Sequence, residues 1–312
     1  MRRVARVATS WAGAGIVDIM IVGAQKAGTS SLLRYLGAHP GIRAAIRPEM
    51  HCFMDPDMDQ RDPSGYRDRY FGPARQPSEL DLVHVGKLAG LMYEPEALEQ
   101  LHRNNPGVQV VAILRDPVRR AYSAFWFARL RAREPLTSFE EALHGDQARF
   151  GTNHNSARRC EYLDRGLYAK HVERLYALFG RDQVHAIILE EFQQDPASTL
   201  APLLRRFHLD PAELPPLAVT QNAARRPRSF RLARLPRSWA GALVARRILP
   251  RGPRVALRRR LRRLNEVAWS PTPMEAATEC ELRAYFAGPN RDLERLLGRD
   301  LSGLWPGPKR PA

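Results

Sequence analysis

The sequence predicts an α/β fold in which helices cover both faces of a central parallel sheet. Strand-like and helix-like segments alternate along the chain with short connections, which is the doubly wound pattern. Residues 108–114 form a nearly continuous apolar run, as expected for a parallel strand that is buried on both faces. A second apolar run, residues 17–22, leads into a glycine-containing loop. The 312 residues can bury one large core, so we expect a single domain over residues 1–312, with residues 1–15 as a disordered extension.

Apolar runs and the residues that interrupt them place the individual elements. Asp116 is a good N-cap and Pro117 a good first helical residue, so a helix should begin there. Gly37 and Gly180 are expected to end helices. The expected strands are residues 17–22, 42–46, 108–114 and 184–189. The expected helices are a short one that carries Leu32, Leu33 and Leu36, and residues 95–103, 117–133 and 168–179.

Composition argues against several classes of protein. No run of 18 apolar residues is present, which argues against a membrane-spanning helix. The basic start of the chain continues into the strand at residues 17–22, so a signal peptide is not expected. Cys52, Cys160 and Cys280 match neither a metal-binding spacing nor a dense disulfide framework. We therefore expect buried thiols, no metal site and a cytoplasmic protein.

The positive charge is concentrated in one segment. Residues 222–265 contain fifteen arginines and no Asp or Glu, which accounts for +15 of the formal net charge of +16. A neutral body with one basic segment indicates a local anionic ligand or surface, such as a ligand covered by a basic lid. A basic amphipathic helix at residues 255–264 would instead bring residues 225–263 against an anionic membrane or another polyanion. Solvated helices that pack on the domain are the simpler interpretation.

The loop after the first strand has the pattern of a phosphate-binding cradle. Gly23-x4-Gly28-Thr29-Ser30 joins a strand to a helix, so backbone N–H groups and the helix N-terminus can hold an anion. This pattern predicts a P-loop-like, three-layer form of the α/β fold. The P-loop of an ATPase has a lysine directly after its second glycine, whereas this chain has Lys26 inside the loop. A sulfuryl group carries less charge than a terminal phosphoryl group, so a loop of this kind could hold it without a metal. A nucleotide-dependent kinase or ATPase is the alternative.

Two blocks of sequence together resemble one family. The loop block is Gln25-Lys26-Ala27-Gly28-Thr29-Ser30-Ser31, and the second block is Leu114-Arg115-Asp116-Pro117 followed by Ser123. They look like the 5′-phosphosulfate loop and the 3′-phosphate block of sulfotransferases that use 3′-phosphoadenosine 5′-phosphosulfate (PAPS), in particular the heparan-sulfate type. Both blocks follow strands and should lie at one edge of the sheet. The resemblance covers most of the chain and implies a bacterial-like soluble enzyme that transfers a sulfuryl group and releases adenosine 3′,5′-bisphosphate (PAP).

The resemblance also implies how the donor is bound. Lys26 would stabilise the leaving oxygen of the 5′-phosphate. Arg115 and Ser123 would bind the 3′-phosphate, because a guanidinium can engage a phosphate through two hydrogen bonds. The late Arg228-Ser229 pair would close over the nucleotide. The remaining residues expected around the 5′-phosphosulfate are Gln25, Ala27, Gly28, Thr29, Ser30 and Ser31.

The acceptor side is less well defined by the resemblance. Glu49 or His51 is expected to contact the acceptor and to act as the general base, although Glu49 could instead pair with Arg47 or Lys26. Lys87 is also expected at the acceptor, but the residues after it depart from the family's Lys-[Thr/Ser]-Pro-x-Tyr motif. The expected acceptor is a hydroxyl or amine of a carbohydrate, a lipid-linked molecule or a small natural product. No nucleic-acid partner is expected, and a basic nucleic-acid-binding protein is the second alternative.

Overall fold

The computed structural model describes residues 15–47, 49–58, 63–73, 81–131, 133–149, 161–216, 225–227, 266–268 and 271–308. As far as it is described, the chain divides into two compact units. The first contains Met1–Arg120, Leu167–Thr220 and Arg283–Ala312, and the second contains Ala121–Gly166 and Gln221–Leu282. The expected single domain over residues 1–312 stays a prediction. The expected N-terminal extension lies almost wholly outside the described residues.

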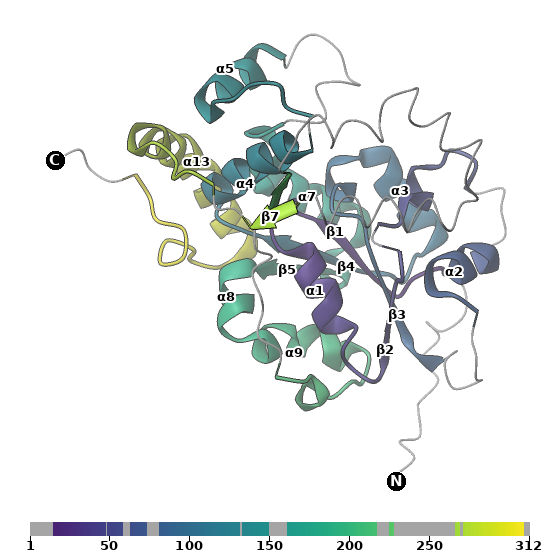
Figure 1. Ribbon diagram of the computed structural model, residues 1–312. Coiled ribbons are helices and arrows are strands. Elements are labelled where there is room, and N and C mark those ends of the chain that lie inside the picture. Colours follow the sequence, from purple (N-terminus) through teal and green to yellow (C-terminus); the bar gives the residue numbers. More distant parts are fainter. Residues whose placement is uncertain are drawn as a thin grey trace, which may run out of the picture. The chain divides into compact units, whose positions relative to one another are not determined.

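The first unit is built on a parallel sheet, as the sequence predicts (Figure 1). Within the described residues its strand order is β2-β3-β1-β4-β5, and all neighbouring strands run parallel. Strand β1 lies at the centre, where β3 pairs with one of its edges and β4 with the other. The strands are β1 (Ile19–Gly23), β2 (Ile42–Ala44), β3 (Val83–Lys87), β4 (Gln109–Leu114) and β5 (Val184–Ile188).

Strand β3 was not predicted from the sequence, because polar residues and a glycine interrupt its apolar pattern. His84 is nevertheless buried, and its backbone N–H donates to the Asp18 carboxylate at 2.7 Å. Gly86 is needed for close packing, since a Cβ at this position would come within 2.1 Å of the Met50 sulfur. The strand ends in Lys87, which is buried as well.

Helices cover both faces of this sheet (Figure 1). On one face, Ile19 and Ile21 pack against α1 (Thr29–Leu36), α8 (Leu189–Gln194) and α9 (Pro196–Arg206). On the other face, Met20 and Val22 belong to a core cluster that includes α3 (Pro95–Asn104) and α7 (Tyr168–Phe179). The alternating side chains of β1 thus serve two cores, which explains why this strand is apolar at every position.

Shorter elements complete the first unit. They are η1 (His51–Met54), α2 (Pro63–Phe71), η4 (Leu91–Tyr93), η6 (Arg181–Gln183), η7 (Pro211–Glu213) and the part of α13 (Ala276–Leu297) that starts at residue 283. The expected strand at residues 184–189 ends one residue early, because Leu189 already begins α8. The expected strand at residues 42–46 ends at Ala44.

The second unit has an aromatic core. Helix α4 (Pro117–Leu130) enters it at residue 121 and is followed by α5 (Phe139–Arg149) and η5 (Asp164–Gly166). Phe125 packs against the rings of Phe139 and Tyr162 at 5.5 and 6.1 Å. Strand β6 (Arg225–Pro227), which lies in the basic segment, pairs antiparallel with β7 (Glu266–Ala268), which directly follows that segment. The expected helix at residues 255–264 lies outside the described residues.

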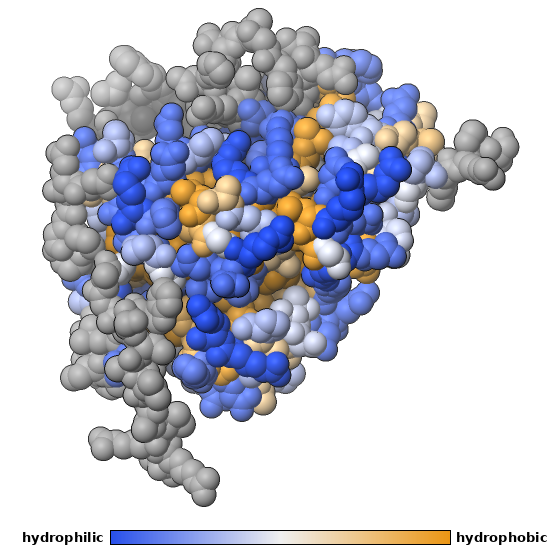
Figure 2. Space-filling view, turned by 180° about the vertical axis from the view of Figure 1, so that it is seen from behind, coloured by the Kyte–Doolittle hydropathy of each residue, from blue (hydrophilic) through white to orange (hydrophobic). Residues whose placement is uncertain are grey.

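Hydrophilic side chains predominate on the face that Figure 2 shows, with smaller hydrophobic areas between them. Among the described residues, the large apolar side chains of Ile46, Met54 and Tyr285 are exposed. None of the described helices is long and apolar enough to cross a membrane.

Candidate active site

The loop between β1 and α1 is held by buried alanines while its polar residues face outward. Ala24 and Ala27 are fully buried, and the Ala24 N–H donates to the Ile113 carbonyl of β4 at 2.7 Å. Gln25 and Lys26 between them are half-buried. Lys26 adopts a left-handed backbone conformation with φ of 72°, which is uncommon for a residue other than glycine. Such outliers are concentrated at functional loops.

The N-terminus of α1 is suited to bind an anion. Gly28 precedes the helix with φ of 93°, and no side chain caps the first turn. A Cβ at this position would also meet a Leu189 methyl at 2.7 Å, so the loop requires glycine here. The first turn carries no acidic residue, and Thr29, Ser30 and Ser31 add hydroxyl groups to its N–H groups. Thr29 is buried, Ser31 is half-buried and Ser30 is exposed.

The loop lies at the point where the sheet changes direction. From β1 the chain builds β2 and β3 on one side and then crosses to β4 on the other side. Ligands of open parallel sheets bind beyond the carboxyl ends of the strands at such a switch point. Lys87 ends β3, the loop with Lys26 follows β1, and Arg115 follows β4. Three cationic residues thus follow three adjacent strands at one edge.

Arg115 reaches back to the loop. Its Nη1 donates to the Lys26 carbonyl at 3.3 Å, so the two blocks predicted to bind the two ends of one nucleotide are in contact. The Arg115 side chain is half-buried, and burial lowers its pKa from the ordinary value, partly opposed by the nearby Glu190. A guanidinium remains protonated in proteins despite such a shift, so Arg115 supplies a fixed positive charge.

Glu49 and Lys87 form an ion pair at the end of β3. The Lys87 ammonium donates to Glu49 Oε1, and the Ala89 N–H donates to Glu49 Oε2 at 2.9 Å. Lys87 is buried, whereas 30% of the Glu49 side chain stays exposed. Among the described ion pairs, the partner of Glu49 is therefore Lys87, and not Arg47 or Lys26 as the sequence suggests. This contact could not be predicted from the sequence, because no local pattern predicts β3.

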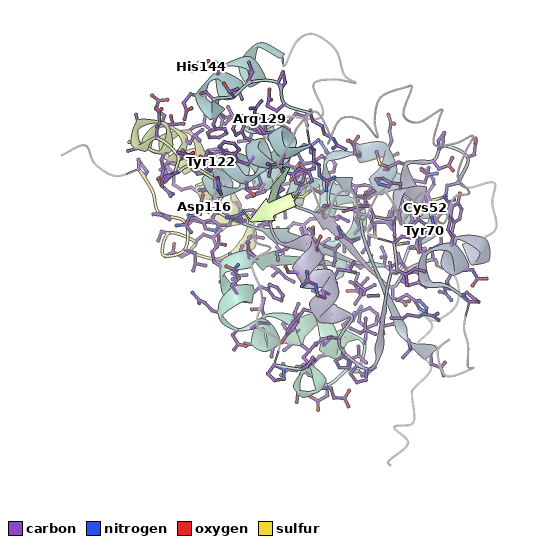
Figure 3. All side chains as sticks on the ribbon, in the orientation of Figure 1. Cys52, Tyr70, Asp116, Tyr122, Arg129 and His144 are labelled. Carbon is purple, nitrogen blue, oxygen red and sulfur yellow. The ribbon has the colours of Figure 1, made fainter. Side chains whose placement is uncertain are left out.

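His51 differs from Glu49 in its exposure. It begins η1, and its side chain is exposed, whereas the next residue, Cys52, turns inward. Figure 3 shows Cys52 beside Tyr70 and far from Asp116, the residue before α4. Burial raises the pKa of the Cys52 thiol to about 11, although a hydrogen bond to Tyr70 opposes the shift. The expectation of a buried thiol is therefore confirmed for Cys52, but it is wrong for Cys280, which is exposed.

The remaining predicted site residues are only partly placed. Ser123 is half-buried on α4, in the second unit, so its approach to Arg115 stays a prediction. Arg228 and Ser229 lie outside the described residues. Within the described part of the chain, no group of three or more His, Cys, Asp and Glu side chains could hold a metal ion.

Sequence reasoning assigned no role to three side chains around Arg115. The Tyr168 hydroxyl donates to the Arg115 carbonyl, Glu190 accepts from the next backbone N–H, and Trp305 donates to Glu190. The sequence shows Tyr168 and Glu190 as polar residues in the first turns of α7 and α8, and Trp305 after the last helix, α13. These positions are the signal from which the contacts could have been predicted.

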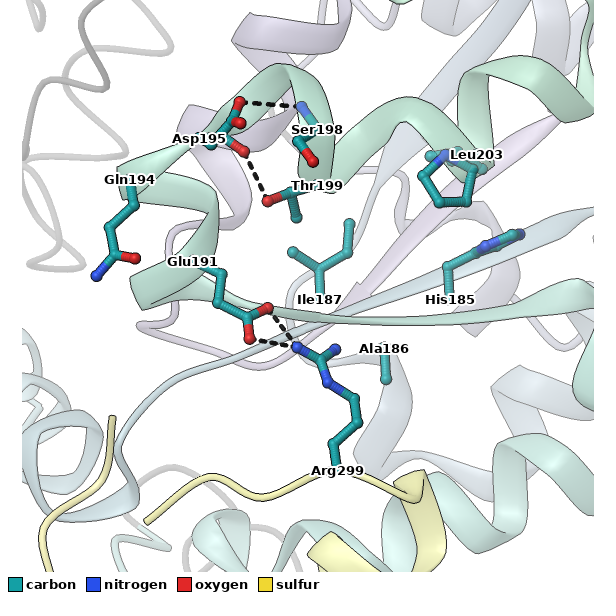
Figure 4. Close-up of a pocket in the computed structure, with 11 residues that line it drawn as sticks. His185, Ala186, Ile187, Glu191, Gln194, Asp195, Ser198, Thr199, Leu203 and Arg299 are labelled. Atoms are coloured by element: carbon teal, nitrogen blue, oxygen red, sulfur yellow. Dashed lines mark hydrogen bonds and ion pairs between the residues drawn. The ribbon is translucent and has the colours of Figure 1, made fainter. Parts of the chain in front are cut away.

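A cavity of about 550 Å³ lies elsewhere, along strand β5 (Figure 4). Arg299 binds both carboxylate oxygens of Glu191 at its mouth, and Asp195 caps α9 through the Ser198 N–H at 3.0 Å. None of the predicted site residues lines this cavity. The residues that line it are His185, Ala186, Ile187, Glu191, Gln194, Asp195, Ser198, Thr199, Pro202, Leu203 and Arg299.

The structure is that of a P-loop-like α/β protein with three cationic residues at the carboxyl ends of adjacent strands. The sulfotransferase domain family matches residues 17–209 of the sequence, and the chain belongs to this family. The match includes the loop after β1, Glu49, Lys87, Arg115 and Ser123. It decides against the kinase or ATPase alternative. The nucleic-acid-binding alternative rested on residues 222–265, of which the structure describes only 225–227.

Individual relatives agree with this assignment. The chain is 26% identical over 205 residues to the bifunctional heparan sulfate N-deacetylase/N-sulfotransferase 1 of Caenorhabditis briggsae, covering 62% of this chain and 22% of the relative. It is 24% identical over 196 residues to the human heparan sulfate glucosamine 3-O-sulfotransferase 5, covering 62% of this chain and 53% of the relative. The chain therefore spans about half or less of the length of these curated relatives.

A solved structure is similar over nearly the whole chain. The crystal structure of a sulfotransferase from Alicyclobacillus acidocaldarius superimposes with a TM-score of 0.63 at 26% identity. The similarity covers 92% of this chain and 98% of the other. It includes the parallel sheet and the helices on its two faces, which confirms the predicted fold class.

Proposed function

We propose that the chain transfers a sulfuryl group from PAPS to an acceptor hydroxyl or amine. The contact between Arg115 and the Lys26 loop is the observation that carries this proposal, because it brings the two predicted phosphate-binding blocks together at the switch point of the sheet. A nucleotide with phosphates at both its 3′ and 5′ positions needs two such anion-binding groups close together. The loop, the uncapped N-terminus of α1 and the two cations suit that donor chemically.

Each residue of the donor site has a proposed role. Lys26 neutralises the charge that develops on the leaving oxygen, and the hydroxyls of Thr29, Ser30 and Ser31 donate around the 5′-phosphate. Arg115 binds the 3′-phosphate, with Ser123 as its proposed partner. We propose that these donors act without a metal, because a sulfuryl group carries less charge than a terminal phosphoryl group.

Glu49 is the proposed general base. The Lys87 ammonium and the Ala89 N–H fix the Glu49 carboxylate in place, while its partial exposure leaves room for an acceptor. In the transfer, the acceptor oxygen or nitrogen forms a bond to sulfur and loses its proton to Glu49. The bond between sulfur and the 5′-phosphate oxygen breaks, and PAP leaves with the electron pair. His51 stays the alternative base, and its exposure also suits a contact with the acceptor.

The proposed acceptor is a carbohydrate, a lipid-linked molecule or a small natural product. The relatives described above include both an N-sulfotransferase and a 3-O-sulfotransferase of heparan sulfate, which supports a glycan amine or hydroxyl among these classes. The basic segment, residues 225–263, is proposed to contact an anionic membrane or a polyanion. A cytoplasmic location is proposed from the pattern of cysteines alone.

Incubation of the full chain with PAPS and a panel of acceptors tests the proposal. The panel should contain N-unsubstituted and N-sulfated glucosamine oligosaccharides, glycolipids and phenolic natural products, and mass spectrometry should detect the addition of one sulfuryl group. We expect modification of at least one acceptor together with the release of PAP, and no modification by Lys26→Ala. Hydrolysis of ATP with magnesium, without any PAPS turnover, would contradict the proposal.

Co-sedimentation with vesicles tests the role of the basic segment. Binding to vesicles with about 30% anionic lipid should be compared with binding to neutral vesicles, at low and at high salt. We expect salt-sensitive binding to the anionic vesicles only. Binding that is equal for both vesicle types, or absent from both, would contradict a membrane contact.

A further inference from the structure

The peptide bond between Arg115 and Asp116 is held from both sides. Its carbonyl accepts a hydrogen bond from the Tyr168 hydroxyl at 2.8 Å. Its N–H donates to Glu190 Oε1 at 3.2 Å. Tyr168 begins α7 and Glu190 lies in the first turn of α8, so two separate helices fix one peptide unit. That unit links the end of β4 to the start of α4.

Trp305 braces both of these contacts. Its indole Nε1–H donates to Glu190 Oε2 at 3.1 Å, and its ring lies 5.9 Å from the ring of Tyr168. Trp305 and Tyr168 are both buried, with 4% and 1% of their surface exposed. Trp305 therefore contacts both side chains that hold the peptide, the Tyr168 hydroxyl-bearing ring on one side and the Glu190 carboxylate on the other.

Asp116 adds a further connection to the same end of the chain. Its Oδ1 accepts from the Val118 N–H at 2.9 Å and so caps α4. Its Oδ2 accepts from Arg283 at 3.4 Å, and Arg283 also donates to the Pro306 carbonyl at 2.7 Å. The segment around Trp305 is thus tied to the turn by two independent routes.

This arrangement determines where the Arg115 guanidinium points. A rotation of the peptide by a few tens of degrees would swing a side chain of this length by several ångströms, and binding groups need to be held far more tightly than that. Tyr168 can act as a donor throughout the usual assay range, because burial raises the pKa of its hydroxyl far above neutrality.

We propose that Tyr168, Glu190 and Trp305 are positioning residues that aim Arg115 at the 3′-phosphate of PAPS. These three side chains are called the clamp below. The inference rests on the proposed donor site. It predicts that the clamp controls the preference of the protein for a 3′,5′-bisphosphate over a 5′-monophosphate. Residues that only stabilise the fold would affect both nucleotides equally.

Calorimetric titration of the full chain with PAP and with adenosine 5′-monophosphate tests this role. Tyr168→Phe removes one hydroxyl and keeps the buried ring, and we expect PAP to bind about three- to tenfold more weakly while the monophosphate binds as before. Trp305→Phe, which removes the indole donor together with part of the buried ring, should shift the preference in the same direction. Tyr176→Phe is the matched control, because this tyrosine lies on the same helix and packs against Arg181 instead of the clamp.

A double-mutant cycle separates positioning from a general loss of structure. In an Arg115→Ala background, Tyr168→Phe should cause no further loss of PAP affinity, since the residue acts only through Arg115. Equal weakening of both nucleotides by Tyr168→Phe and Trp305→Phe would overturn the clamp, as would an unchanged preference in a protein that otherwise prefers PAP. A wild-type protein that binds both nucleotides equally would overturn the proposed donor site itself.

Discussion

Lys26 occupies a position where the backbone already favours a functional role. Lys26 has a left-handed backbone and is half-buried. It lies between the fully buried Ala24 and Ala27, two residues before the Gly28 that precedes α1. A residue without a functional role would relax this strain by mutation to glycine or asparagine. The position thus supports the leaving-group role that the resemblance implies.

Lys26→Ala should lower kcat by at least about 100-fold, the order found when one donor to a developing oxyanion is removed. The variant should keep the circular dichroism spectrum and thermal unfolding midpoint of the wild type, because alanine and lysine are equally strained at this φ. Arg34→Ala, which removes an exposed cation from the following helix α1, is the control. Unchanged turnover of Lys26→Ala would remove the assignment.

Arg115→Ala should weaken the binding of PAP by roughly 1.5–3 kcal/mol, the size of a hydrogen bond to a charged group. Arg119→Ala is the matched control, because Arg119 is exposed and its ion pair with Asp116 is long, at 3.8 Å. Calorimetry gives both values directly. Equal affinities of wild type and Arg115→Ala would show that this guanidinium does not bind the nucleotide.

Cys52 should resist thiol reagents. With its pKa raised to about 11 by burial, only about 0.1% of the thiol is ionised at pH 8, and the thiolate is the reactive form. Iodoacetamide should therefore modify the exposed Cys280 long before Cys52, and the rate at Cys52 should rise as the pH approaches 11. Peptide mapping by mass spectrometry measures both sites. Fast modification of Cys52 at pH 8 in the folded protein would contradict the buried environment.

At the scale of elements, the sequence predicted the strands in which apolar residues predominate. Strand β4 is buried at all six positions, and its apolar run shows this directly. Strand β3 is equally buried but contains His84, Gly86 and Lys87, whose polar atoms or small size are accommodated only by tertiary contacts. Such contacts join residues far apart in the sequence, so no local pattern reveals them.

The same reason explains which parts of the site were predicted. The Lys26 loop and the Arg115 turn are continuous stretches at strand ends, and their placement follows from the order of the elements. The partner of Glu49 depends on β3. The contacts that hold the Arg115 turn come from Tyr168, 53 positions from Arg115, and from Glu190, 74 positions from Asp116. These parts required the structure.

The segment between β2 and η1 separates the two candidate bases. It turns Glu49 toward the buried Lys87 and leaves His51 exposed. Glu49→Gln should lower kcat by about 100-fold or more without changing the affinity for PAP, because a general base contributes at least that factor. His51→Ala should lower kcat much less. The opposite order of effects in steady-state kinetics would make His51 the base.

At the scale of the whole molecule, we propose that the donor binds at the switch point of the parallel sheet. Lys87, Lys26 and Arg115 follow three adjacent strands, and the family match from residue 17 to 209 includes all three. The second unit contributes Ser123 and the basic segment, whose part in closing over a nucleotide stays a prediction. The cavity along β5 is separate from these residues.

Titration of the full chain with PAP, once with EDTA and once with magnesium, tests the central claim most directly. We predict saturable binding of one PAP per chain with the same affinity in both buffers, because an ammonium, hydroxyls and a guanidinium supply the attraction. The absence of binding to the folded protein, or binding only with magnesium, would contradict the donor site.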